Sequence, residues 1–187
     1  TYTNGDEVEL FLNGKSLGVK KNSTDPKLRA RIKWDNIAYA PGTLVAVAKK
    51  NDKVVARHQI ETTGEAVALK LVPDMETWHA DGKDLMHVRI YAVDKKGRRV
   101  LNVKDAKAFD KLTFQVKGDA NIVAVDNGNI ASDELHIGKT QLEKSIQRNL
   151  FQGSALVILR AGDKPGKIEL SVDGEKMKAK KLVLNTK

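Results

Sequence analysis

Three carboxylates near the start of the chain have the types and spacing that could do acid–base chemistry. Asp6, Glu7 and Glu9 lie within the stretch DEVELFLNGKSLG. Cleavage of a glycosidic bond uses two carboxyl groups, about 5 Å or roughly 6.5–9.5 Å apart. In a strand, Glu7 and Glu9 would share one face, opposite Val8 and Leu10, and would lie in water if the aliphatic face is core. We therefore interpret them as charges that keep a strand soluble, and we expect no catalytic residue here.

Histidine and cysteine give no clear metal or nucleophile pattern. The four histidines, His58, His79, His87 and His136, form neither an HxH nor an HExxH motif. A zinc site needs three or four convergent ligands, which this spacing does not predict. The chain has no cysteine, so thiolate ligands, disulfides and cysteine nucleophiles are excluded. We expect no metal and no cofactor.

Two short stretches could bind a ligand. Asp126-Asn127-Gly128-Asn129 has some likeness to a calcium loop, but lacks the spaced acids of an EF-hand, so we interpret it as a turn. Trp78 lies in residues 73–80, between predicted strands, where its side chain could be exposed. It is the one candidate for a ligand or interdomain contact; packing between domains is the alternative.

The elements that would position these residues are strands. Alternation of apolar and polar residues recurs, most regularly over residues 27–34, where Leu28, Ala30, Ile32 and Trp34 would face a core. Asn13-Gly14 is the strongest of several turn signals, because a type I′ turn needs positive φ at both residues. Residues 140–149 are interpreted as a loop with a helical turn. Many short strands at this spacing predict an all-β sandwich or barrel.

A domain boundary is expected near Thr62-Thr63-Gly64-Glu65. The sequence predicts two tandem immunoglobulin-like β-sandwich domains, residues 1–63 and residues 64–187. An immunoglobulin-like sandwich takes about seven strands and about 100 residues, which the second segment can supply. The first segment is short, so we expect a partial module truncated at its N-terminus.

Composition excludes some classes of function. The 187 residues are 41% apolar, which is enough for a core, and no apolar run is long enough to span a membrane. The net charge of +9 comes from 33 basic and 24 acidic residues, but the lysines are scattered and no nucleic-acid-binding motif is present. We expect a lysine-rich solvated surface, with no nucleic acid and no membrane as partner.

Eight motifs follow one another along the chain, at residues 2–18, 40–48, 53–57, 61–65, 80–85, 93–97, 125–128 and 151–158. Taken in this order, they resemble the non-catalytic C-terminal region of bacterial β-galactosidases of glycoside hydrolase family 2. The resemblance covers nearly the whole chain. Residues 102–111 and 129–149 depart from the family pattern and are expected to be variable loops.

The resemblance implies an accessory region of a larger periplasmic or extracellular enzyme, typical of Bacteroidetes, that hydrolyses O-glycosyl bonds. The catalytic barrel of that enzyme would be the partner of this region, which would brace the barrel, assist a homo-oligomer or extend the substrate approach. No motif here matches the catalytic glutamates of the family, so the fragment itself is expected not to be an enzyme. A carbohydrate-binding module and an adhesin-like tandem sandwich remain the alternatives.

Overall fold

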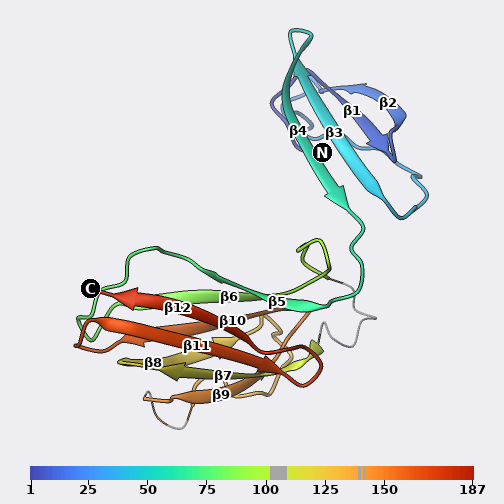
Figure 1. Cartoon of the computed structure of the whole chain (residues 1–187). Coiled ribbons are helices and arrows are strands. Elements are labelled where there is room, and N and C mark those ends of the chain that lie inside the picture. Colours follow the sequence, from blue (N-terminus) through green and yellow to red (C-terminus); the bar gives the residue numbers. More distant parts are fainter. Residues whose placement is uncertain (102–108, 139, 141) are drawn as a thin grey trace. The chain divides into compact units, whose positions relative to one another are not determined.

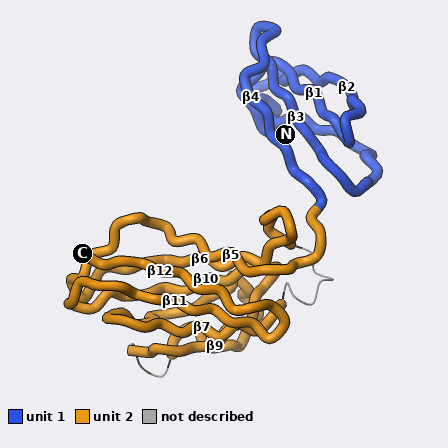
Figure 2. Tube along the Cα trace, viewed as in Figure 1, with its two compact units in different colours: residues 1–62 blue, residues 63–187 orange. Residues whose placement is uncertain are grey.

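The computed structural model describes residues 1–101, 109–138, 140 and 142–187 as two compact units, Thr1–Thr62 and Thr63–Lys187 (Figures 1 and 2). The division falls one residue before the boundary expected from the sequence. Within the described residues, all regular elements are strands, and they form three antiparallel sheets. The predicted all-β fold class is confirmed. Part of one expected variable loop, residues 102–108, lies outside the described residues.

Unit 1 is a single four-stranded sheet with strand order β2-β1-β3-β4. Both of its consecutive hairpins turn at residues with positive φ, Asn13-Gly14 and Asn51-Asp52, as type I′ turns require. Its small core contains Val8, Ile32 and Ala48. The strands are β1 (Glu7–Leu12), β2 (Lys15–Lys21), β3 (Thr43–Lys50) and β4 (Lys53–Glu61).

The prediction of a strand over residues 27–34 is wrong. Residues 26–30 form a turn, and Leu28 is 47% exposed, although Ile32 is buried as expected. The Asp25 carboxylate accepts the Lys27 backbone N–H, and the Asp25 carbonyl accepts the N–H of Leu28. Such local hydrogen bonds offer the backbone an alternative to a sheet ladder, and they override the alternating pattern.

Unit 2 is a sandwich of two four-stranded sheets, ordered β5-β6-β10-β8 and β12-β11-β7-β9 (Figure 1). Its apolar core includes Phe114, Ile90 and Leu170, all fully buried. In β10 and β6 every second residue is buried, so the inner and outer faces can be assigned along each strand. The strands are β5 (Ala68–Pro73), β6 (Leu85–Val93), β7 (Lys111–Lys117), β8 (Ala120–Asp126), β9 (Ser145–Asn149), β10 (Ser154–Ala161), β11 (Gly166–Gly174) and β12 (Lys180–Thr186).

The loop between β8 and β9 runs back along β8, which is an edge strand of its sheet. The backbone N–H of Val125 donates to the His136 carbonyl, and that of Ile122 donates to the Glu143 carbonyl. These bonds occupy donors of an edge that would otherwise be open to another chain. The loop is therefore attached to the sandwich at both ends of β8.

Candidate functional site

Each of the three N-terminal carboxylates has a contact within unit 1. Glu7 lies 3.8 Å from the Lys49 ammonium on the paired strand β3, and Glu9 accepts a hydrogen bond of 2.7 Å from the Ser16 hydroxyl on β2. Asp6 accepts the backbone N–H of Asn51 at 2.8 Å. Each carboxylate thus has a separate structural contact, with strands or turns of its own sheet.

Trp78 is buried in unit 2, contrary to the exposed position that the sequence allowed. Its side chain is 1% exposed within the apolar core, and the indole N–H donates to the Asp84 carbonyl at 3.1 Å. Its backbone is bridged to Thr186. A ring in this position packs the sandwich and presents no face on which a sugar could stack.

Three of the four histidines each lie against one carboxylate rather than against one another. Within the part of the chain that the structure describes, no group of three or more histidine, cysteine, aspartate or glutamate residues is arranged to hold a metal ion. The pairs are His79 with Asp84 at 3.1 Å, His87 with Asp74 at 3.0 Å, and His136 with Asp126 at 3.5 Å.

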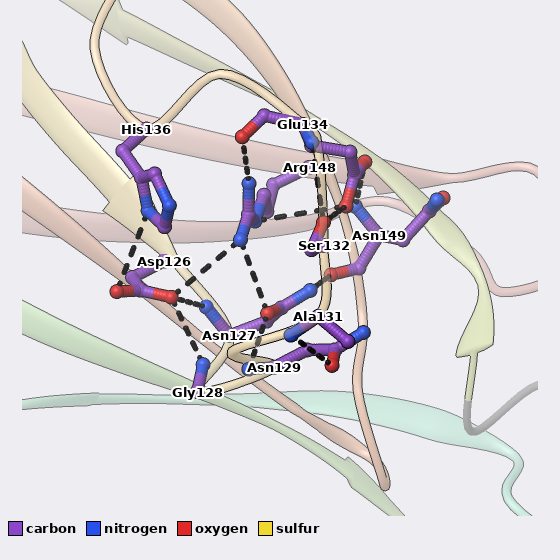
Figure 3. Close-up of polar contacts among 10 residues, drawn as sticks. All are labelled: Asp126, Asn127, Gly128, Asn129, Ala131, Ser132, Glu134, His136, Arg148 and Asn149. Atoms are coloured by element: carbon purple, nitrogen blue, oxygen red, sulfur yellow. Dashed lines mark hydrogen bonds and ion pairs between the residues drawn. The ribbon is translucent and has the colours of Figure 1, made fainter.

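A fully buried arginine organises the β8–β9 loop (Figure 3). Arg148 points inward from β9 and is 0% exposed. Its Nη1 donates to the Glu134 carbonyl at 2.6 Å, and its Nη2 donates to Asn127 Oδ1 at 3.2 Å. Nη2 also lies 3.6 Å from Asp126 Oδ1, and Nε lies 3.6 Å from Glu134 Oε2, beyond hydrogen-bonding distance. One guanidinium therefore binds the first turn of the loop and its middle at once.

Glu134 and Asn127 complete this network from the loop side. The Glu134 carboxylate accepts the backbone N–H of Asn149 at 3.0 Å and the Ser132 hydroxyl at 3.2 Å. The Asn127 amide donates to the Asn149 carbonyl at 2.9 Å. Through these contacts the network links the first turn and the middle of the loop to strand β9.

Asp126 forms the turn that starts the loop. Its Oδ1 accepts the backbone N–H groups of Gly128, at 2.9 Å, and of Asn127. The bond from Gly128 is the main cause of the lowered pKa of Asp126, followed by that from Asn127 and by the nearby charges of His136 and Arg148. Stretch 126–129 is thus a turn built by an ionised aspartate, as the sequence indicated.

The loop presents apolar side chains to solvent. Ile130 is 104% exposed and Leu135 is 72% exposed, and Ile137 is exposed too. We call these three residues the apolar loop patch. These side chains come from one loop, and Leu142 further along it is 63% exposed as well. Large aliphatic side chains exposed on one segment make that segment a candidate for contact with another part of a protein.

A pocket lies on the outer face of the β5-β6-β10-β8 sheet, beside the same turn. It has a volume of about 330 Å³ and is lined by Arg89, Tyr91, Arg99, Asp126, Asn127, Gly128, Ser154, Ala155 and Leu156. The Arg99 guanidinium lies over the Tyr91 ring, 5.0 Å from its centroid, and donates to the Ser154 hydroxyl at 3.0 Å. The loop cluster and the pocket therefore share Asp126.

The sequence did not reveal Arg148, Glu134 or the pocket. The sequence predicts a loop with a helical turn over residues 140–149, whereas Ser145–Asn149 is strand β9. The available signal was the alternation of Ile146 and Arg148, which places an arginine where the pattern expects an apolar residue. The acceptors of its two hydrogen bonds are 14 and 21 positions away in the sequence, which spacing cannot predict.

Unit 2 packs two antiparallel four-stranded sheets around one apolar core, and it belongs to the class of immunoglobulin-like β-sandwich modules. A family model for the glycoside hydrolase family 2 C-terminal domain 5 matches residues 69–183, and a model for a domain of unknown function (DUF4982) matches residues 1–56. The chain belongs to the glycoside hydrolase family 2 C-terminal domain 5 family.

Relatives of this chain are much longer than it is. It is 37% identical over 174 residues to Beta-galactosidase BoGH2A of Bacteroides ovatus, covering 93% of this chain and 19% of that protein. A putative beta-glucuronidase of Formosa agariphila is 33% identical over 172 residues, which cover 84% of this chain and 20% of that protein. The chain spans about a fifth of each.

A solved structure confirms the fold. The crystal structure of a glycosyl hydrolase family 2 member from Bacteroides cellulosilyticus matches with a TM-score of 0.82 and 30% identity, covering 100% of this chain and 22% of that one. Among the described residues no helix has the length and apolarity needed to cross a membrane.

Proposed function

We propose that this chain is a non-catalytic accessory region of a longer glycoside hydrolase, and that it docks on the rest of that enzyme through the apolar loop patch. The catalytic residues would lie outside these 187 residues. The enzyme would hydrolyse O-glycosyl bonds, with a β-galactoside as the first substrate to test, and would work in the periplasm or outside the cell.

The apolar loop patch carries this proposal. Ile130, Leu135 and Ile137 are exposed on a loop that a buried arginine network holds in place. Keeping large aliphatic side chains in water costs free energy, and burying each of them would contribute about 1.5–3 kcal/mol. A preorganised loop loses little conformational entropy when it docks, so more of that energy would appear as affinity.

The rest of the enzyme is the occupant that the comparisons favour. Both relatives named above are glycosidases by name, and this chain matches only about a fifth of their length. A covalently linked partner has a high effective concentration, so docking within one chain requires less buried surface than association of two separate proteins. The contacts of Asp6, Glu7 and Glu9 within unit 1 support a structural role for those acids.

Two measurements test the proposal. The isolated chain should not hydrolyse an aryl β-galactoside; turnover that purifies with the chain and survives Glu7→Gln and Glu9→Gln would contradict a non-catalytic role. In the longer enzyme, Ile130→Ser with Leu135→Ser should lower the Tm while leaving that of the isolated chain unchanged. Val183→Ser, at another exposed aliphatic position, is the matched control. Equal effects of the patch and control variants would remove the docking role.

A further inference from the structure

The outer-face pocket has a cationic side and an acceptor side. Strand register places Leu156 of β10 opposite Arg89 of β6 and opposite Asp126 of β8. Because neighbouring strands lie about 4.8 Å apart, the backbones of Arg89 and Asp126 are separated by about 10 Å, with Leu156 between them. Arg89 and Asp126 therefore flank an apolar floor.

The cationic side holds two guanidinium groups. Arg89 is exposed, and Arg99 lies over the Tyr91 ring while donating to the Ser154 hydroxyl. Each guanidinium has five N–H donors, so the bond to Ser154 leaves most of those on Arg99 for a ligand. Paired donors in a planar fork match the two oxygens of a carboxylate.

The acceptor side is the Asp126 carboxylate, whose Oδ1 accepts two backbone N–H groups and whose Oδ2 lies 3.5 Å from His136 Nδ1. Asp126 is 49% exposed, and its pKa is lowered chiefly by the backbone N–H of Gly128, so the side chain is an anion at neutral pH. An ionised carboxylate accepts hydrogen bonds and repels another anion. A ligand that fills the pocket should therefore carry hydroxyl donors on the side that faces Asp126.

We propose that this pocket binds a uronic acid residue of a saccharide. The sugar carboxylate would lie against Arg89 and Arg99, its hydroxyl groups would donate to Asp126, and its C–H face would pack on Leu156. Its volume of about 330 Å³ is at the lower end of the range for small-ligand sites and is of the size of one sugar residue rather than a longer saccharide. The pocket borders the first turn of the β8–β9 loop, but it is lined neither by Trp78 nor by a residue of the apolar loop patch, so a variant at Arg89 tests it without changing the patch.

The test is a titration of the 187-residue chain, followed by backbone amide NMR, with methyl β-D-glucuronide. The matched neutral ligand is methyl β-D-glucoside, which has a hydroxymethyl group in place of the carboxylate. We expect saturable shifts at Tyr91, Ser154 and Gly128 with the glucuronide and weaker binding of the glucoside. Arg89→Gln should weaken glucuronide binding by about tenfold or more, because a hydrogen bond to a charged group is lost. Arg57→Gln in unit 1 removes the same charge and should have no effect.

Four results would overturn the assignment. Neither sugar shifts these amides, or both bind equally. Sodium acetate binds as tightly as the glucuronide, which would show that the hydroxyl groups contribute nothing. Galactose 6-sulfate binds as tightly, which would show that the pocket does not select a carboxylate.

Discussion

Removing the side chain of Arg148 should release the β8–β9 loop and destabilise unit 2. In Arg148→Ala, the Glu134 carbonyl loses a hydrogen bond of 2.6 Å and Asn127 Oδ1 loses one of 3.2 Å. The Glu134 and Asp126 carboxylates also lose the cation that lies 3.6 Å from each. A cavity forms as well, since the arginine is fully buried.

The size of the effect follows from these contacts. A hydrogen bond to a charged group contributes about 1.5–3 kcal/mol, so the two bonds together contribute about 3–6 kcal/mol. The two nearby carboxylates are 49% and 26% exposed, so solvent screening makes their ion pairs with Arg148 a smaller contribution. Arg148 Nε has no acceptor within hydrogen-bonding distance, so part of the cost of burying the guanidinium is not offset in the folded state. The lower part of the range for the two hydrogen bonds therefore applies. We expect the free energy of unfolding to fall by about 3–5 kcal/mol, which lowers the Tm by about 10–20 °C in a domain of this size.

Thermal melts measure the loss of stability, and hydrogen exchange of the loop measures its release. Arg148→Lys keeps the charge but not the planar fork, so it should lose less stability than Arg148→Ala. Arg89→Ala, at an exposed position of β6, is the control for loss of an arginine and should shift the Tm by no more than about 2 °C. If Arg148→Ala matched that control, and exchange of residues 128–136 were unchanged, the proposed support of the loop by Arg148 would be refuted.

Three further changes test other parts of the chain. The Arg98 guanidinium is the main cause that holds the pKa of Asp94 well below its ordinary value of 3.8. This interaction stabilises the folded state above about pH 4, and the stabilisation is lost as the pH falls through the lower folded pKa. In thermal melts, Asp94→Asn should therefore have a lower Tm than the unchanged chain at pH 7, and the two Tm values should lie closer together at pH 2. Gly153→Ala should lower the free energy of unfolding by about 1–3 kcal/mol in urea titrations, because φ is +70° and the new Cβ would meet the Val100 carbonyl; an unchanged midpoint would contradict this. Glu7→Gln with Glu9→Gln should cost less than about 1 kcal/mol in the same assay, since contacts of partly exposed charges contribute little, and a larger loss would show that these acids matter more than the structure indicates.

Most strands could be predicted from the sequence because alternation and turn residues act locally. The type I′ turn at Asn13-Gly14 was predicted from residue type alone and has positive φ at both positions. Residues 27–34 show where such reasoning fails, since the Asp25 side chain competes for the backbone and no periodicity records that competition. Trp78 shows a second kind of failure, because the core that buries it is formed by strands distant in sequence.

The candidate site could not be predicted because its parts meet only through the sheet topology. Arg89, Leu156 and Asp126 come from three strands, and their alignment depends on the β6-β10-β8 order. Arg148 is hidden for a different reason: a buried charge in a strand breaks the apolar alternation and lowers the strand signal. Only the contacts with Glu134 and Asn127 explain why this position tolerates it.

Hydrogen–deuterium exchange of residues 128–138, compared between the isolated chain and the longer enzyme, tests the accessory docking role most directly. Docking predicts that peptides from this loop exchange more slowly in the longer enzyme, while peptides from β12, where Val183 is exposed, exchange at the same rate in both. Identical exchange of the loop in the two proteins would contradict the docking of the apolar loop patch on the rest of the enzyme.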